Sequence, residues 1–143
     1  MSIQQVSIFA ENKPGSLAKV TSVLSAAKIN IRATTIATSD TFGVISLIVD
    51  DAGRACQTLT DAGIMATLKN VIAVLIDDRP GGLDNLIQLL YKTKVNIGNA
   101  YGFVLESSKS AVFVVDVDPA DKAEELITQG GFKMLSAAEL AAL

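Results

Sequence analysis

Apolar positions along the chain follow two different spacings, one typical of strands and one typical of helices. Gln5 to Ala10 forms a mainly apolar run, and Leu17, Val20 and Leu24 then recur at the spacing of one helical face. From Ile29 to Thr38 the chain is rich in β-branched residues, which favours a strand. The pattern therefore predicts a strand, a helix and another strand in that order.

Turn and cap residues place the remaining elements of this half. A strand near Gly43 to Val49 forms a hairpin with the strand before it. Asp50 or Asp51 is expected as a helix N-cap, Gly63 ends that helix, and a short strand follows at Ile64 to Leu68. The order is βαββαβ, which is the ferredoxin-like order.

The second half of the chain repeats the first. Asn12 to Ile31 aligns with Asp78 to Ile97 at an offset of 66, and seven of the twenty positions are identical. Farther along the offset becomes 68, which predicts a longer hairpin around Glu106 to Ser110. We therefore expect an α+β fold of two ferredoxin-like βαββαβ units side by side, at residues 1–69 and 70–143. Each unit has an antiparallel sheet with its helices on one face.

Element signals in the second half match those of the first. Asp118-Pro119 predicts a helix start with proline at the first helical position, and Gly130 or Gly131 predicts its end. Ser136 and Glu139 predict a capping box that starts a short tail helix. The expected strands are Asn70 to Ile76, Val95 to Leu105, Ala111 to Val117 and Phe132 to Leu135.

Some strands carry apolar residues on both faces. Val44 to Val49 and Val112 to Val115 lack the apolar–polar alternation of a sheet with one wet face. A unit of about 66 residues is also only marginally stable alone. We therefore expect the two units to share one sheet, and this sheet to pack on a second copy in a homodimer.

Composition removes several classes of function. Lys and Arg number 12 against 15 Asp and Glu, with no basic block, which argues against a nucleic-acid partner. The chain has no histidine and one cysteine, Cys56, so no His-based catalytic or metal site and no cofactor is expected. No apolar run reaches the roughly 18 residues of a membrane span, and the N-terminus lacks signal-peptide features. A cytoplasmic protein without a membrane partner is the expectation.

The segment NKPGSL, from Asn12 to Leu17, carries the candidate chemistry. Gly15 has no Cβ, so a small molecule can approach the N–H groups of Gly15, Ser16 and Leu17 at the helix start. The positive end of the helix suits a carboxylate, and Asn12 could orient an adjacent ammonium group, so an α-amino acid fits. The same residues also form an ordinary turn and cap without any ligand.

A second polar motif, Asn30-Ile31 and its repeat Asn96-Ile97, begins the strand after each of these helices. A helix from Gly15 to Lys28 is about 20 Å long, so Gly15 and Asn30 lie too far apart to hold one small molecule. Asn30 and Asn96 are alternatively left-handed helix caps. If the units are related by a pseudo-twofold axis, the turn of one meets the Asn strand of the other. The first pocket then contains Asn12, Gly15, Ser16, Leu17, Asn96 and Ile97, and the second contains Asp78, Gly81, Gly82, Leu83, Asn30 and Ile31.

The two motifs, NKPGSL followed by KINI and DRPGGL followed by KVNI, resemble those of tandem ACT domains over nearly the whole chain. The resemblance implies binding of an amino acid between paired domains and regulation of an attached or associated enzyme of amino-acid metabolism. No catalytic domain is recognised here. Asp78 replaces Asn12 and Gly82 replaces Ser16 in the second unit, and a carboxylate there would repel a ligand carboxylate. The first pocket is therefore the preferred site.

Two other functions stay open. A ligand-free interaction module would dock a partner enzyme of amino-acid metabolism through its apolar sheet face. An enzyme would have to use exposed polar residues without a histidine or a paired-carboxylate motif, so a non-catalytic regulator that binds a free amino acid is preferred. The candidates for such an enzyme are Asp77, Asp78, Arg79, Glu106 and Lys109.

Overall fold

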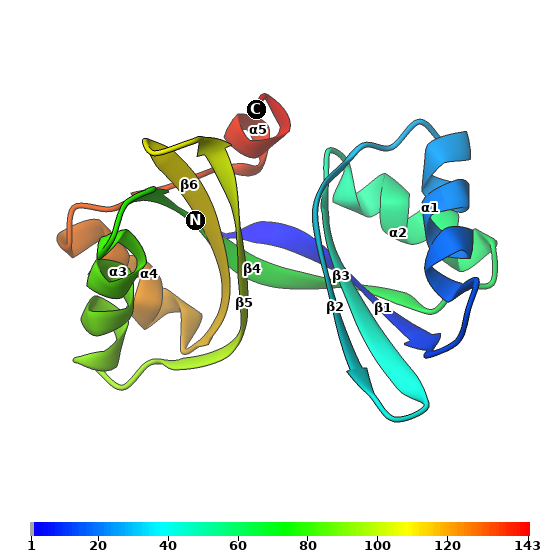
Figure 1. Ribbon diagram of the computed structural model, residues 1–143, viewed down its shortest axis with the longest axis horizontal. Helices are drawn as coiled ribbons and strands as arrows, with labels where there is room; N and C mark the ends of the chain where they lie inside the picture. The colour runs from blue at the N-terminus through cyan, green and yellow to red at the C-terminus, as the bar shows by residue number, and fades with distance from the viewer. Residues whose placement is uncertain (1) are drawn as a thin grey trace. The chain divides into compact units, whose positions relative to one another are not determined.

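The computed structural model describes residues 2–143 and confirms the α+β fold of two ferredoxin-like units. The first elements are β1 (Ile3–Glu11), α1 (Ser16–Ala26), β2 (Ile31–Ser39), β3 (Phe42–Val49), α2 (Ala52–Asp61) and β4 (Ala66–Asp77). The elements that follow are α3 (Gly82–Tyr91), β5 (Asn96–Glu106), β6 (Ser110–Asp118), α4 (Ala120–Gln129), β7 (Lys133–Met134) and α5 (Ala137–Ala141) (Figure 1).

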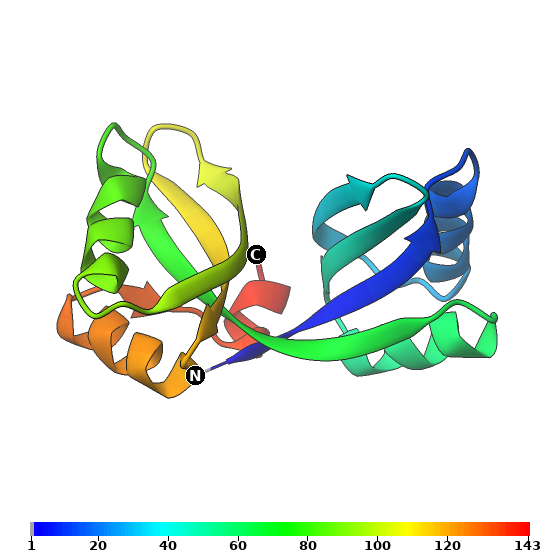
Figure 2. The ribbon, with the colours of Figure 1, turned by 90° about the horizontal axis from the view of Figure 1, so that it is seen from below.

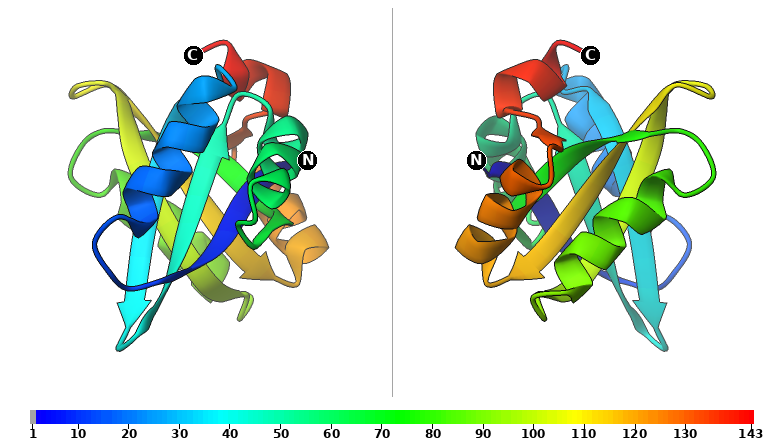
Figure 3. Two further views of the ribbon diagram at one scale, coloured as in Figure 1. Left: turned by 90° about the vertical axis from the view of Figure 1, so that its right-hand side faces the viewer. Right: turned by 90° about the vertical axis from the view of Figure 1, so that its left-hand side faces the viewer.

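Backbone contacts divide the chain into two compact units. The N-terminal unit is residues 4–69, and the C-terminal unit is residues 70–143 with Ser2 and Ile3. In the N-terminal unit, β3 lies between β1 and β2 and is antiparallel to both. In the C-terminal unit, β6 lies between β4 and β5, and β7 pairs with β4. In each unit two helices pack together on one face of the sheet, α1 with α2 and α3 with α4 (Figures 2 and 3).

β4 differs from the prediction. The sequence predicted two strands, Ile64 to Leu68 and Asn70 to Ile76, whereas the structure has one strand of 12 residues, Ala66–Asp77. No glycine or proline interrupts the chain between Met65 and Asp77, and Asn70 alone does not break the strand. The boundary between the two units at Lys69 falls inside this strand.

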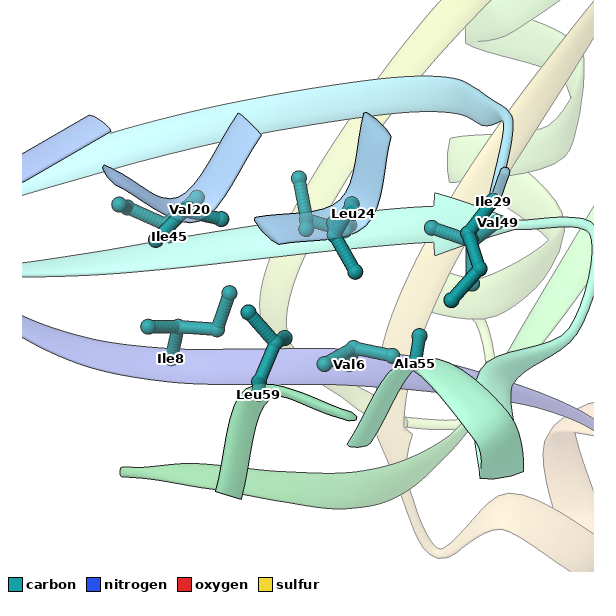
Figure 4. Close-up of a cluster of buried hydrophobic side chains, with 10 residues drawn as sticks. Val6, Ile8, Val20, Leu24, Ile29, Ile45, Val49, Ala55 and Leu59 are labelled. Carbon is teal, nitrogen blue, oxygen red and sulfur yellow. The ribbon is translucent and has the colours of Figure 1, made fainter. Parts of the chain in front are cut away.

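The core of the N-terminal unit lies between its helices and its sheet. Figure 4 shows Val20 and Leu24 of α1 and Leu59 of α2 among side chains of β1 and β3. Leu24 and Leu59 are completely buried, because the three-to-four-residue spacing of the apolar positions turns one helical face toward the sheet. The buried cluster is Val6, Ile8, Val20, Leu24, Ile29, Ile45, Leu47, Val49, Ala55 and Leu59.

The C-terminal unit builds its core from the same positions of the repeat. Leu86 and Leu90 of α3 stand where α1 has Val20 and Leu24, at the offset of 66. From β6 onward the correspondence uses the offset of 68. The buried cluster is Ile72, Val74, Leu86, Leu90, Val95, Val115, Val117, Ala123 and Ile127, and each member matches a core residue of the N-terminal unit.

The change of offset arises in the second hairpin. Two residues separate β2 from β3, and three separate β5 from β6. The second additional residue is accommodated by a shift of register in β5 between Val104 and Glu106. The predicted lengthening near Glu106 is therefore confirmed, with one residue in the turn and one in a β-bulge.

Helices α1 to α4 all end in the same way. After α1, Lys28 has a φ of 56° and its N–H donates to Ser25 O, while the N–H of Ile29 donates to Leu24 O. This is the Schellman pattern, in which a left-handed residue closes the helix. The left-handed residues are Lys28, Gly63, Lys94 and Gly131. Gly63 and Gly131 were predicted as stops, whereas the alternative that Asn30 and Asn96 are left-handed caps is wrong.

Two predicted helix starts are confirmed and one is shifted. The Asp51 side chain caps α2 by accepting from Arg54 N at 3.1 Å. Ser136 and Glu139 form the predicted capping box of α5, and the hydrogen bond from the Ser136 backbone N–H lowers the pKa of Glu139. Pro119 is the N-cap of α4 instead of its first residue, because Asp118 is still paired with Asn96 in the sheet.

The faces of β3 and β6 that point away from the helices are also apolar. Ile48, Val112 and Val114 lie on these faces and are buried. Large exposed apolar side chains occur elsewhere in the N-terminal unit. Phe9, Phe42 and Met65 are 53%, 64% and 68% exposed.

We expect Leu24→Ala to lower the free energy of unfolding by about 2–5 kcal/mol, because a fully buried side chain is replaced by a cavity. Tyr91→Ala is the control on a helix surface, since Tyr91 is 75% exposed. Urea denaturation followed by circular dichroism measures both variants. A loss of less than about 1 kcal/mol for Leu24→Ala would contradict the described core.

Candidate functional site

The turn between β1 and α1 is built around a left-handed glycine. Gly15 is the N-cap of α1 with a φ of 92°, a conformation that side chains with a Cβ rarely adopt. The N–H of Ser16 donates to Lys13 O at 3.3 Å and closes the turn. The prediction that this N–H is free for a ligand is therefore wrong, and backbone geometry supplies a reason for Gly15 that does not depend on ligand access.

Asn12 fixes this turn to the β2–β3 hairpin. Its backbone N–H donates to Thr41 O at 2.8 Å, and its side-chain Nδ2 donates to Asp40 O at 3.0 Å. The amide nitrogen of Asn12 thus has a structural role, and the Oδ1 atom is the part of the amide that a ligand ammonium group would use.

Asp78 holds the hairpin of the C-terminal unit as Asn12 holds that of the N-terminal unit, but its side chain accepts a hydrogen bond where that of Asn12 donates one. Its backbone N–H donates to Lys109 O at 3.2 Å, and its carboxylate accepts from the N–H of Ser108 at 2.7 Å. An amide donor in one unit is therefore replaced by a carboxylate acceptor in the other. The change from Asn12 to Asp78 is explained by the hairpin that each side chain holds.

Gly82 is required by the close approach of the chain to itself. A Cβ on Gly82 would lie 2.0 Å from Asp77 O and 3.1 Å from Asp77 C, whereas Ser16 carries its side chain at the equivalent position. Gly81 has a φ of 86° and repeats the left-handed N-cap of Gly15. The start of α3 is thus packed against the end of β4 more tightly than a residue with a side chain permits.

A depression of about 540 Å³ lies at the start of α1. It is bounded by the end of β1, the β1–α1 turn, the first turns of α1 and the turn before β4. Gly15 and Ser16 line it, whereas Asn12 and Leu17 are not among its lining residues. The lining is Phe9, Ala10, Glu11, Lys13, Pro14, Gly15, Ser16, Lys19, Val20, Gly63, Ile64 and Met65.

Sequence reasoning missed the side chains that give this depression its character. Lys19 lies one helical turn after Gly15, and the strand segments at Phe9 and Met65 are brought together because the N–H of Phe9 donates to Met65 O at 3.1 Å, with both side chains on the sheet face away from the helices. Comparing the two repeats would have identified them as positions that differ between the halves. Their convergence, however, depends on pairing between strands that are far apart in sequence.

Of the two lysines that line this depression, one pairs with a carboxylate and the other does not. Lys13 Nζ lies 2.9 Å from Glu11 Oε2, and both side chains are more than 60% exposed. Lys19 forms no ion pair with any residue in the range 2–143, which leaves one cation beside the positive end of α1. The arrangement suits a ligand with a carboxylate.

The other predicted site residues lie in different places. Asn30 and Ile31 line a separate depression of about 460 Å³ at the other end of α1. Asp78 and Leu83 line a third, of about 330 Å³, with Phe103 and Phe113. Asn96 begins β5, and Ile97 packs against the core of the C-terminal unit. Gly81 and Gly82 are not among the lining residues of the third depression.

Four of the five polar residues considered for an enzyme form surface ion pairs, and the fifth, Asp78, holds the β5–β6 hairpin. Arg79 Nη2 lies 3.1 Å from Asp77 Oδ2, with both side chains more than 60% exposed. Lys109 pairs with Glu106 in the β5–β6 hairpin. Burial raises the pKa of Tyr101 above its ordinary value.

Comparison with known proteins decides the family. The sequence profile of the ACT domain pair matches residues 1–143. This chain belongs to the ACT domain family. The crystal structure of protein BT0572 from Bacteroides thetaiotaomicron has a TM-score of 0.93 and 31% identity, over 100% of this chain and 98% of that one. A comparison with curated proteins found no match.

More distant solved structures share the fold of this ACT domain pair. The ligand-free regulatory subunit of aspartate kinase from Thermus thermophilus has a TM-score of 0.63 and 18% identity, over 89% of this chain and 91% of that one. The regulatory subunit of aspartate kinase from Thermus flavus has a TM-score of 0.59 and 18% identity, over 90% and 92%. Among residues 2–143, no helix has the length and apolar character needed to cross a membrane.

Gly82→Ala is expected to lower the free energy of unfolding by about 1–3 kcal/mol or more, because the new Cβ would overlap the backbone of Asp77. Ser16→Ala is the matched control in the N-terminal unit and should change stability by less than about 0.5 kcal/mol. Urea denaturation of the two variants measures the difference. Equal stability of both variants would show that the α3 turn is not packed as described.

Proposed function

We propose that this ACT domain pair is a non-catalytic regulatory protein that binds a free amino acid at the interface of its two domains, residues 1–69 and 70–143. The observation that carries the proposal is the depression at Gly15 and Ser16, which contains the unpaired Lys19 at the positive end of α1. A ligand carboxylate would bind at Lys19 and the first turn of α1. Asn12 Oδ1 would accept from the ligand ammonium group.

We assign the contacts with the rest of the ligand to the second domain, residues 70–143. In this proposal Asn96 and Ile97 complete the first pocket, together with Asn12, Gly15, Ser16 and Leu17. Asn96 is exposed at the beginning of β5, which leaves its side-chain amide accessible. An amide there would add a hydrogen-bond donor and an acceptor to a zwitterionic ligand.

The second pocket is proposed as a weaker or inactive site. Its residues are Asp78, Gly81, Gly82, Leu83, Asn30 and Ile31. Asp78 uses its carboxylate to hold Ser108, and the close approach of Asp77 to Gly82 leaves less space at the start of α3. Both features favour binding in the first pocket.

Regulation would follow from a difference in ligand affinity between two arrangements of the protein. The proposed responder is a partner enzyme of amino-acid metabolism, by analogy with the two Thermus proteins, which are regulatory subunits of aspartate kinase. We propose that the protein acts in the cytoplasm as a homodimer without a cofactor. Sedimentation at several protein concentrations tests the dimer, and a monomer at micromolar concentration would refute it.

One observation favours a second candidate, a ligand-free module that docks a partner protein. Phe9 and Phe42 are more than half exposed, and pairing of β1 and β3 places both on the sheet face away from the helices. An exposed apolar surface of this kind is typical of interaction sites. Thermal-shift screening of the twenty amino acids separates the candidates, because a ligand at 100 times its Kd stabilises by about 2.7 kcal/mol. No shift with any amino acid would favour the interaction module.

Asn96→Ala is expected to weaken binding of the best amino acid about three- to tenfold, because one hydrogen bond is lost. Asn30→Ala is the matched control, since Asn30 occupies the same position in the other repeat and belongs to the second pocket. Isothermal titration calorimetry measures both. If Asn30→Ala weakened binding and Asn96→Ala did not, the ligand would have been assigned to the wrong pocket.

A further inference from the structure

Three large apolar side chains are exposed together on one face of the N-terminal sheet. Phe9, Phe42 and Met65 are each more than half exposed. The N–H of Phe9 donates to Met65 O, which places the two residues on neighbouring segments. Phe42 is the diagonal neighbour of Phe9 in the β1–β3 pairing, a separation of about 7–8 Å that aromatic side chains can bridge. We call these three side chains the outer patch.

The core of the unit fixes the direction in which the outer patch points. The residues before and after Phe9, and those before and after Met65, pack on the core beneath the helices. Because side chains alternate between the faces of a strand, Phe9 and Met65 point to the opposite face. Phe42 pairs with Glu11, two residues after Phe9, and therefore shares that face. The flanking core residues are Ile8, Ala10, Ile64 and Ala66.

The surroundings of the outer patch carry little charge. The positions that strand register places around it are Glu11, Thr35, Ala37, Ser39 and Val44. Glu11 is the charged residue among them, and its carboxylate lies 2.9 Å from Lys13 Nζ. A surface that packs on its own copy about a twofold axis must not bring like charges together. This surface meets that condition, because its centre is apolar and its rim carries one acid and one base.

The C-terminal unit has no equivalent of the outer patch. Leu75, Ser110 and Lys133 stand at the positions of Phe9, Phe42 and Met65. Lys133 is held by Glu139 of α5 at 3.3 Å, whereas the N-terminal unit continues from this position into β4. Packing inside a ferredoxin-like unit therefore does not require the three apolar side chains, and another contact has to account for them.

The size of the outer patch suits the centre of a dimer interface. At roughly 200 Å² for a large side chain, the exposed parts of the three residues amount to about 350 Å². A stable interface takes about 800 Å² from each partner, with an apolar centre and a polar rim. The small and hydroxyl-bearing residues of β2 around the patch, Thr35, Ala37 and Ser39, extend the surface toward that size.

We infer that the outer patch is the homodimer interface, where it packs on the outer patch of a second copy of this chain about a twofold axis. This inference rests on the proposed homodimer and names its surface. Phe9, Phe42 and Met65 lose their contact with water in both copies, which drives the association. At the rim, Glu11 of each copy faces Lys13 of the other. A partner enzyme as the occupant is the alternative that the experiments decide against.

Sedimentation equilibrium of the full chain compares the unchanged protein with Phe42→Asp and Met65→Lys. Each variant places two like charges in the apolar centre, so the dimer dissociation constant should rise at least 100-fold. Tyr91→Asp is the control on the exposed surface of α3 and should leave the constant unchanged. Both patch residues are exposed, so circular dichroism should show folded monomers for the two variants.

A charge exchange tests whether the patch meets itself. Phe42→Asp and Phe42→Lys should each be monomeric alone and should form a heterodimer when mixed, because opposite charges then meet across the axis. The measurement is sedimentation of the equimolar mixture with one variant fluorescently labelled. If the mixture stays monomeric, the patch packs on a different surface and the twofold arrangement is wrong.

The remaining outcomes separate the inference from the proposals on which it rests. If the unchanged protein sediments as a monomer, the inference and the proposed homodimer both fail, and the amino-acid screen still tests the regulatory function. If Phe42→Asp dimerises as the unchanged protein does, the homodimer stands and its interface lies elsewhere. A dimeric Phe42→Asp variant with a lowered melting temperature would assign the patch to a contact within one chain, which also overturns the inference.

Discussion

Burial of two amphipathic helices against one face of a sheet is the constraint on which each half of this protein depends. Leu24 and Leu59 in one unit, and Leu90 and Ile127 in the other, are completely buried between the layers. A unit of about 66 residues has little other apolar area to bury, so few residue types are tolerated at these positions. Because the helices must lie over the sheet, the chain has to turn sharply at the start of α1 and α3. The candidate site is a consequence of that turn.

The turns before α1 and α3 have the same backbone conformation but different surroundings. Gly15 and Gly81 are both left-handed N-caps, and both turns are tied to a hairpin through the residue three positions earlier. Around this shared geometry, a side chain at Ser16 is replaced by the obligatory Gly82. Duplication therefore preserved the scaffold, while substitution of side chains at the turn gave the two halves different chemical surfaces.

Function in such a pair depends on the parts of the repeat that differ. Core positions match from unit to unit because packing limits them to apolar residues of similar size. Lys19 is exposed, so packing does not dictate its identity, and the C-terminal unit has Asn85 instead. This difference is the physical basis for expecting one binding site in place of two equivalent ones.

The sequence by itself determined the order of the elements, the repeat and its cores, because hydrophobic periodicity, caps and turn residues act over a few neighbouring residues. It also located the turn at Gly15. The tertiary structure decided that Ser16 N–H is used inside the turn, that β4 is one continuous strand, and that Phe9 lies beside Met65. Those features depend on hydrogen bonds and contacts that form only when the chain folds, and local sequence patterns carry no information about which distant side chains meet.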